Sequence, residues 1–217
     1  MTCTILARCA ETGQLGIGLV SSMMAVTGRC AFVRAGVGAV VVQSMADPRL
    51  GPAALELLQA GYRPVAVLRA FDRTEEAFEF RQVALVSARG DTAVHSGKRA
   101  AGVCGAAEAK DCASLCNRMV DPRLPQLMVE ACVQTSGELA GRLMAALRAA
   151  TAEGGAGTVR AAGLLIAEHE PWPLVDLRID WTEGDPVEEL DRLWGLWRPQ
   201  MRDYLNRALD PAIAIDP

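Results

Sequence analysis

Hydrophobic and polar residues alternate in two short segments near the start of the chain, residues 2–8 and 15–22. A period of two is typical of β-strands, and the Glu-Thr-Gly turn at 11–13 predicts that the two strands form a hairpin. A β-branched run between glycines, residues 37–43, is typical of a buried strand. Two further strand pairs are predicted, at 82–87 with 92–96 and at 162–167 with 174–179.

Segments between these strands repeat apolar residues every three to four positions, which predicts helices at 49–60, 63–71, 124–135 and 137–152. A last helix is expected at about 185–206, with Asp185 as its N-cap and Pro186 in its first turn. Blocks of strands alternate with blocks of helices, which favours an α+β fold of antiparallel sheets covered by helices. We expect a single domain over residues 1–217, without an internal repeat.

Composition narrows the classes of function. The 217 residues are 51% hydrophobic and 22% charged, which is typical of a globular protein and excludes disorder. A net charge of −4 and 5% aromatic residues argue against a nucleic-acid partner. No apolar run approaches the ~20 residues of a membrane helix. Seven cysteines, an odd number, and a start that does not resemble a signal peptide predict a reduced, cytoplasmic protein.

Several familiar motifs are excluded. The glycines at 13, 16 and 18 have the wrong order for a dinucleotide fingerprint, and the glycine-rich run at 154–158 lacks the Lys of a phosphate-binding loop. Cys112 and Cys116 would share one face of a helix, but no second pair of ligands follows them, and only His95 and His169 are histidines. Zinc would need four ligands. These motifs therefore do not indicate a dinucleotide, a phosphate-binding loop or a zinc site.

Thr2 is a candidate nucleophile. A small residue after the initiator Met1 usually allows Met1 to be removed, which would expose the α-amine of Thr2. Such an amine has a pKa of about 7.7–8.0, so near neutral pH it can accept the proton of its own hydroxyl. A threonine activated in this way is an established catalytic arrangement. Because many proteins begin Met-Thr, an ordinary threonine on an edge strand is the alternative.

Several segments in order resemble family 1028 of the domains of unknown function, which is placed in the N-terminal-nucleophile (Ntn) hydrolase superfamily. Beyond the start of the chain, they include Asp-Pro-Arg-Leu-Gly at 47–51, Arg-Gln-Val-Ala at 81–84 and Asn-Arg-Met at 117–119. The full set is residues 1–8, 11–16, 34–43, 47–51, 81–84, 95–97, 117–119 and 175–180. The resemblance implies a four-layer αββα sandwich and hydrolysis of an amide by the exposed N-terminal residue.

The resemblance also implies roles for particular residues. Thr2 would be the nucleophile and its amine the base. Gln43 and Asn117 would orient the substrate carbonyl or stabilise an oxyanion with their amide N–H groups. The residues carried over as substrate-binding are Ser22, His95 and Asp47, with Ser21 or Ser22 near Thr2 and His95 near the leaving group.

The chain departs from the family at three places. Met23 stands where the family has a Lys or Arg that would lower the pKa of the amine. The run at 156–162 lacks most of the family's polar groups, and Cys116 replaces a Gly before Asn117. The chain is thus a divergent member. The leading hypothesis is a cytoplasmic amidohydrolase that cleaves a C–N bond of a small molecule. It implies neither a metal nor an organic cofactor, since one residue supplies both the nucleophile and the base. The alternative is an inactive Ntn fold that serves as a binding or assembly module.

The apolar stripe of the last predicted helix is wider than one face. Leu193, Trp194, Leu196 and Trp197 cover more of the helix surface than packing on one sheet would bury. Tryptophan is also favoured in the cores of interfaces. We therefore predict a homodimer, and packing of all four side chains within one monomer is the alternative.

Overall fold

The computed structural model describes residues 1–152 and 157–212 and contains two antiparallel sheets. The larger sheet has the strand order β10-β9-β2-β1-β8-β7 and the smaller has the order β3-β4-β5-β6. The strands of the larger sheet are β1 (Thr2–Arg8), β2 (Leu15–Ser21), β7 (Gly105–Ala109), β8 (Cys112–Asn117), β9 (Ala161–Ala167) and β10 (Val175–Ile179). Those of the smaller sheet are β3 (Ala31–Arg34), β4 (Gly38–Gln43), β5 (Gln82–Ser87) and β6 (Thr92–Ser96).

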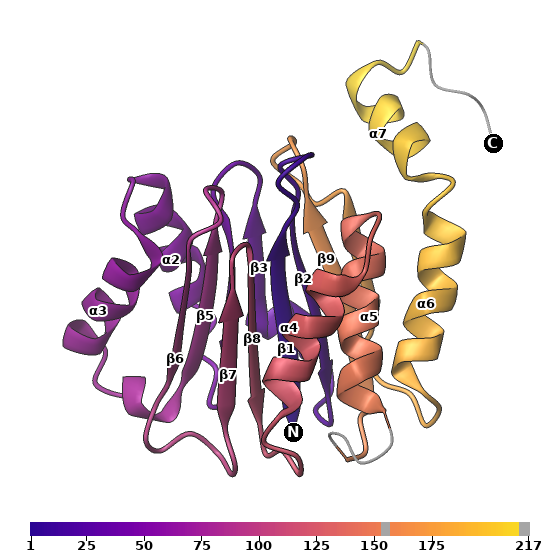
Figure 1. Cartoon of the computed structure of the whole chain (residues 1–217). Coiled ribbons are helices and arrows are strands. Elements are labelled where there is room, and N and C mark those ends of the chain that lie inside the picture. The colour runs from indigo at the N-terminus through magenta and orange to yellow at the C-terminus, as the bar shows by residue number, and fades with distance from the viewer. Residues whose placement is uncertain (153–156, 213–217) are drawn as a thin grey trace.

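Helices cover the outer face of each sheet, so the chain forms the expected four-layer αββα sandwich (Figure 1). One apolar cluster joins the larger sheet to its helices, a second lies between the sheets, and a third joins the smaller sheet to its helices. The helices on the larger sheet are α4 (Leu124–Gln134), α5 (Leu139–Thr151) and α6 (Pro186–Trp197). On the smaller sheet they are α2 (Leu50–Gln59) and α3 (Pro64–Thr74), and the short elements are α1 (Thr27–Cys30) and η1 (Phe78–Phe80).

Strand β1 is central in the larger sheet and sets the position of Thr2. Its register pairs Thr2 with Ser21 of β2 on one side and with Asn117 of β8 on the other. Successive side chains of a strand point to opposite faces. Cys3 and Ile5 pack toward the helices, whereas Leu6 belongs to the cluster between the sheets. Thr2 therefore shares its face with Leu6 and points between the two sheets.

The predicted hairpins, strand pairs and helices are present, but the strands β3, β7 and β8 and the short elements α1 and η1 were not predicted. Strand β3 and the β7–β8 hairpin are short or rich in small residues, so their periodicity is weak. The interpretation of Cys112 and Cys116 as neighbours on a helix was wrong, because both lie in β8. Of the unusual run at 156–162, Ala156 lies outside the described residues.

The C-terminal segment forms two helices in place of the expected single helix at 185–206. Asp185 caps α6 as predicted, since its Oδ1 accepts hydrogen bonds from the backbone of Val187 and Glu188. Helix α6 ends at Trp197, and α7 (Met201–Leu209) begins after Pro199, which has no N–H to continue a helix. In the described part of the chain, no helix is both long and apolar enough to cross a membrane.

The expectation that the chain has no internal repeat was also wrong. Residues 43–50, Gln-Ser-Met-Ala-Asp-Pro-Arg-Leu, correspond to residues 117–124, Asn-Arg-Met-Val-Asp-Pro-Arg-Leu. Each segment begins at the last residue of a strand and ends at the first residue of a helix, β4 to α2 in one sheet and β8 to α4 in the other. The two segments thus occupy equivalent places in the two halves of the sandwich.

Candidate functional site

A cavity of about 230 Å³ opens between the two sheets at the N-terminal end of β1. Thr2, Gln43 and Asn117, which the sequence placed in one site, all line it. The two copies of the repeat form two walls of the cavity, one from each sheet, and the segment after β2 forms a third wall. The remaining lining residues are Met1, Met23, Met24, Val26, Arg29, Cys30, Ser44, Met45, Ala46, Ala101 and Arg118.

The hydroxyl of Thr2 is held by Ser21. Thr2 Oγ1 lies 3.0 Å from Ser21 Oγ. Ser21 Oγ donates to the carbonyl oxygen of Met1 at 3.0 Å and accepts from the backbone N–H of Met23 at 3.0 Å. Because a hydroxyl has a single proton, which Ser21 gives to Met1, Thr2 is the donor toward Ser21. The side chain of Thr2 is therefore fixed at the wall of the cavity.

Met1 covers this end of the strand. Its side chain is buried, and its amine donates to Ser22 Oγ at 2.8 Å, while the backbone N–H of Ser22 donates to the Met1 carbonyl. Burial lowers the pKa of this amine from its ordinary value, and the nearby positive charge of Arg118 lowers it further. Arg118 is thus a basic group close to this end of β1.

Four buried polar side chains form a hydrogen-bond network next to Thr2. Gln43 Nε2 and Asn117 Nδ2 each donate to Gln82 Oε1 at 3.0 Å. Gln43 Oε1 accepts from Thr4 Oγ1 at 2.6 Å. Each amide nitrogen carries two hydrogens and uses one on Gln82, so each has a second N–H that this network does not use. The two amides are positioned by Gln82, which sequence reasoning assigned no role.

Several residues at or next to the cavity have a positive φ, which strains the backbone. Ser44, Met45 and Arg118, which line it, have φ of 51°, 24° and 50°, and Ala25 beside it has φ of 52°. Such values are unfavourable for residues with a side chain and often mark functional sites. Ser44 and Arg118 hold equivalent positions of the repeat. Ser44 Oγ accepts from the N–H of Ala101, and the N–H of Arg118 donates to the carbonyl of Ala101, which fixes the β6–β7 loop over the cavity.

Asp47 supports the cavity wall and does not line the cavity. Its carboxylate accepts two hydrogen bonds from Arg49 Nε and Nη2, at 3.0 and 2.7 Å, and lies 3.5 Å from Arg81 Nη2. The Arg49 hydrogen bonds lower the pKa of Asp47 to about 2. Arg81 also donates to the carbonyl of Met45. Asp47 and Arg81 therefore brace the strained Ser44–Met45 turn.

His95 and Ser22 differ in their distance from the site. His95, in β6, stacks on the ring of Phe78 with 4.0 Å between centroids, and its Nε2 lies 3.2 Å from the carbonyl oxygen of Phe78. It is not among the residues that line the Thr2 cavity. Ser22 contacts Met1 directly through its hydroxyl. Thr2, Gln43 and Asn117 thus line the cavity, Ser22 lies next to it through its contacts with Met1, and His95 and Asp47 do not line it.

Besides Thr2, the cavity residues with a nucleophilic side chain are Ser44, whose hydroxyl accepts a hydrogen bond from Ala101, and Cys30. Burial raises the pKa of Cys30 to about 11, so this thiol is protonated at neutral pH and a poor nucleophile. Within the described residues, no group of three or more His, Cys, Asp and Glu side chains is arranged to hold a metal ion. The polar groups at this cavity are hydroxyls, an amine, amide donors and two guanidinium groups.

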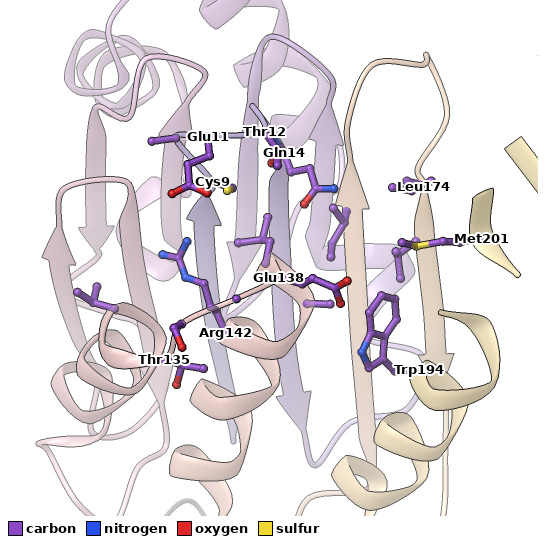
Figure 2. Close-up of a pocket in the computed structure, with 18 of the residues that line it drawn as sticks. Cys9, Glu11, Thr12, Gln14, Thr135, Glu138, Arg142, Leu174, Trp194 and Met201 are labelled. Carbon is purple, nitrogen blue, oxygen red and sulfur yellow. Dashed lines mark hydrogen bonds between the residues drawn. The ribbon is translucent and has the colours of Figure 1, made fainter. Parts of the chain in front are cut away.

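A second cavity, of about 700 Å³, lies between the β1–β2 turn, helix α5 and the C-terminal helices (Figure 2). Figure 2 shows Arg142 of α5 extending toward Cys9 and Glu11, and Trp194 of α6 on the opposite wall. Cys9 follows the last residue of β1 and Thr2 is its first, so the cavities are separated by the strand's length, roughly 20 Å. None of the six sequence-predicted site residues lines this second cavity.

Comparisons with known proteins found one family model and similar solved structures. The model of the "Family of unknown function (DUF1028)" matches residues 2–190. The crystal structure of protein SPO2555 from Silicibacter pomeroyi, described under the same family model, is 25% identical. It matches over 94% of this chain and 89% of that chain with a TM-score of 0.86. Anbu, the ancestral β-subunit from Yersinia bercovieri, is 10% identical over 93% of this chain and 96% of its own, with a TM-score of 0.37. No curated protein matches the chain.

Proposed function

We propose that this chain, which belongs to the family of unknown function DUF1028, is an amidohydrolase whose nucleophile is the Thr2 hydroxyl after Met1 has been removed. The observation that supports this most strongly is the meeting of Thr2, Gln43 and Asn117 at one cavity between the sheets. The substrate is a small amide, since the cavity holds about 230 Å³. We propose that the enzyme acts in the cytoplasm.

Removal of Met1 would place a new α-amine on the residue that carries the nucleophile. The hydroxyls of Ser21 and Ser22, which now donate to the Met1 carbonyl at 3.0 and 3.3 Å, would lose that acceptor and lie beside the new amine. The burial and the Arg118 charge that lower the pKa of the present amine act at this same end of β1. A lower pKa leaves more of the amine unprotonated at neutral pH, which a general base requires.

The reaction then proceeds in two stages. Thr2 Oγ attacks the carbonyl carbon of the amide while its proton passes to the Thr2 amine. The C–N bond breaks as the ammonium returns this proton to the leaving nitrogen, which leaves an ester on Thr2 and releases the amine product. Water, deprotonated by the same amine, attacks the ester and releases a carboxylic acid. The sum is one amide and one water converted to one acid and one amine.

The unused N–H groups of Gln43 and Asn117 would stabilise the oxyanion of both tetrahedral intermediates. They come from equivalent positions of the repeat and are held by one oxygen of Gln82, so they are ordered before the substrate arrives. Preorganised donors of this kind are each worth roughly 2.7–4 kcal/mol in transition-state stabilisation when they are fully effective.

Amine release from a panel of small amides tests the proposal. We expect turnover by the Met1-free protein, loss of at least about a thousandfold for Thr2→Ala, and partial retention for Thr2→Ser, which keeps a hydroxyl. Thr74→Ala is the matched control, because Thr74 is an exposed threonine at the end of α3. Turnover by Thr2→Ala equal to that of the control would contradict the proposal.

A second function, ligand binding without turnover, is supported by the state of Met1. With Met1 in place, its side chain is buried, its amine is bound by Ser22, and Thr2 has no free amine of its own. A population that retains Met1 would bind a small amide at the same cavity and not cleave it. Binding without amine release, in protein shown by mass to carry Met1, is the result that this second function predicts.

A further inference from the structure

Positive charge lines the Thr2 cavity, and no lining residue is acidic. Arg29 of α1 and Arg118 after β8 are both exposed, and in the described part of the chain neither guanidinium makes a hydrogen bond or an ion pair. By contrast, Arg49 and Arg123 of the repeat are each paired with an aspartate two residues earlier. In a chain with a net charge of −4, the two cavity arginines are thus a local excess of positive charge that a ligand can use.

Three methionines form an apolar rim on the same cavity. Met23, Met24 and Met45 line it with exposed fractions of 59%, 58% and 60%. Large apolar side chains gathered in the open mark binding surfaces more often than single exposed ones do. Methionine is flexible and polarizable, so it adapts to apolar groups of varied shape. The rim therefore suits an apolar side group of a ligand.

We propose that the substrate class of this site is a small amide that carries a carboxylate and an apolar side group, as an N-acylated amino acid does. This inference rests on the proposed function. Arg29 and Arg118 would bind the carboxylate, the methionine rim would hold the side group, and the amide carbonyl would lie toward Thr2, Gln43 and Asn117. Guanidinium groups bind carboxylates through charge-assisted hydrogen bonds, which are about twice as strong as neutral ones.

The pair N-acetyl-leucine and N-acetyl-leucinamide tests this directly, since the two differ only in a carboxylate against a neutral amide. Calorimetric titration of Met1-free Thr2→Ala protein measures binding without turnover. We expect N-acetyl-leucine (the acid) to bind at least about tenfold more tightly than N-acetyl-leucinamide (the amide). Arg29→Gln and Arg118→Gln should each weaken binding of the acid by roughly tenfold and change binding of the amide little.

Arg69→Gln is the matched control, because Arg69 is an exposed arginine on α3 and does not line the cavity. Circular dichroism confirms that each variant is folded. Equal affinity for the two compounds, no binding of either, or loss of acid binding in Arg69→Gln as large as in Arg29→Gln would overturn the inference.

Hydrolysis by the Met1-free protein with Thr2 intact separates this inference from the proposed function. Cleavage of the acetyl–nitrogen bond at the same rate in N-acetyl-leucinamide and in N-acetyl-leucine, measured below saturation, would overturn the carboxylate preference and leave the hydrolase intact. Binding of the acid in preference to the amide, with no cleavage of any amide, would overturn the hydrolase and support the preference.

Discussion

Gln43 Nε2 and Asn117 Nδ2 donate to the same atom, Gln82 Oε1, each over 3.0 Å. The two amides begin the two copies of the repeat and reach the cavity from different sheets. Gln82 is fully buried and is itself anchored, since its Nε2 donates to Ser96 Oγ at 2.9 Å and to the carbonyl of Cys116 at 3.1 Å. One glutamine thus joins the two halves of the sandwich at the proposed oxyanion site.

Replacing Gln82 by leucine should impair both stability and catalysis. The buried donors of Gln43 and Asn117 would lose their shared acceptor, which costs roughly 1–3 kcal/mol in the free energy of unfolding. The two amides would also lose their orientation, so kcat should fall by about tenfold or more. Denaturant unfolding and amine release measure the two effects. Gln126→Leu, at an exposed position of α4, is the control, and a Gln82→Leu protein with unchanged kcat would argue against this positioning role.

Arg118→Gln should change the pH dependence of turnover. The positive charge of Arg118 lowers the pKa of the Met1 amine, and burial lowers it more. We expect both effects to act on the Thr2 amine once Met1 is removed. The amine must be unprotonated to act as a base, so activity is lost as the pH falls through its pKa. Without Arg118 this pKa rises, and the acid limb of the kcat profile should move to higher pH. The profile of Arg69→Gln should match that of the unsubstituted protein; an unmoved acid limb in Arg118→Gln would count against the role.

Asp47→Asn should reduce stability, and the effect should depend on pH. The pKa of Asp47 is about 2 in the folded protein against an ordinary value of 3.8, so the ionised carboxylate stabilises the fold above about pH 4. This contribution is lost as the pH falls from about 4 to 2. We expect Asp47→Asn to lose about 1 kcal/mol at pH 7, because Arg49 is largely exposed and the pair is screened by solvent. Denaturant unfolding at pH 7 and pH 2 should give a clearly larger difference from the unsubstituted protein at pH 7 than at pH 2.

The homodimer remains a prediction, and the residues that support it differ from those expected from the sequence. Trp194 and Trp197 pack against their own core, and Trp197 Nε1 donates to the carbonyl of Leu174 at 3.1 Å. The exposed apolar residues of this region are Leu196, Tyr204 and Leu209, and α7 extends beyond the sheets (Figure 1). We expect sedimentation at micromolar concentration to show a dimer. A single 23 kDa species would contradict it.

The sequence predicts the regular elements well where periodicity is strong. Alternation identifies the β1–β2 hairpin, and the Asp185 cap identifies the start of α6. Strands β7 and β8 are rich in small residues, so their hydrophobic pattern is too weak to predict a strand. The apolar stripe of α6 continues into α7, so the pattern alone does not show that the helix ends before Pro199.

Thr2, Gln43 and Asn117 entered the candidate site through the resemblance to the family. Gln82 and Arg118 lie within segments of that resemblance but received no role, and Arg29 lies outside them. The roles of all three depend on how the elements meet around the cavity. The repeated Met-x-Asp-Pro-Arg-Leu sequence is a signal in the chain itself that relates Gln43 to Asn117, since each lies two residues before the Met of its copy.

The state and reactivity of Thr2 are the central claim, and mass spectrometry of the purified protein tests both. Intact mass reports whether Met1 is absent. Incubation with an acylating β-lactone, followed by digestion and peptide sequencing, reports which residue becomes acylated. We predict that the chain begins at Thr2 and that the label lies on its side-chain oxygen, with no label on Thr2→Ala. Retention of Met1 on all molecules, or labelling of another residue while Thr2 stays unmodified, would contradict the account.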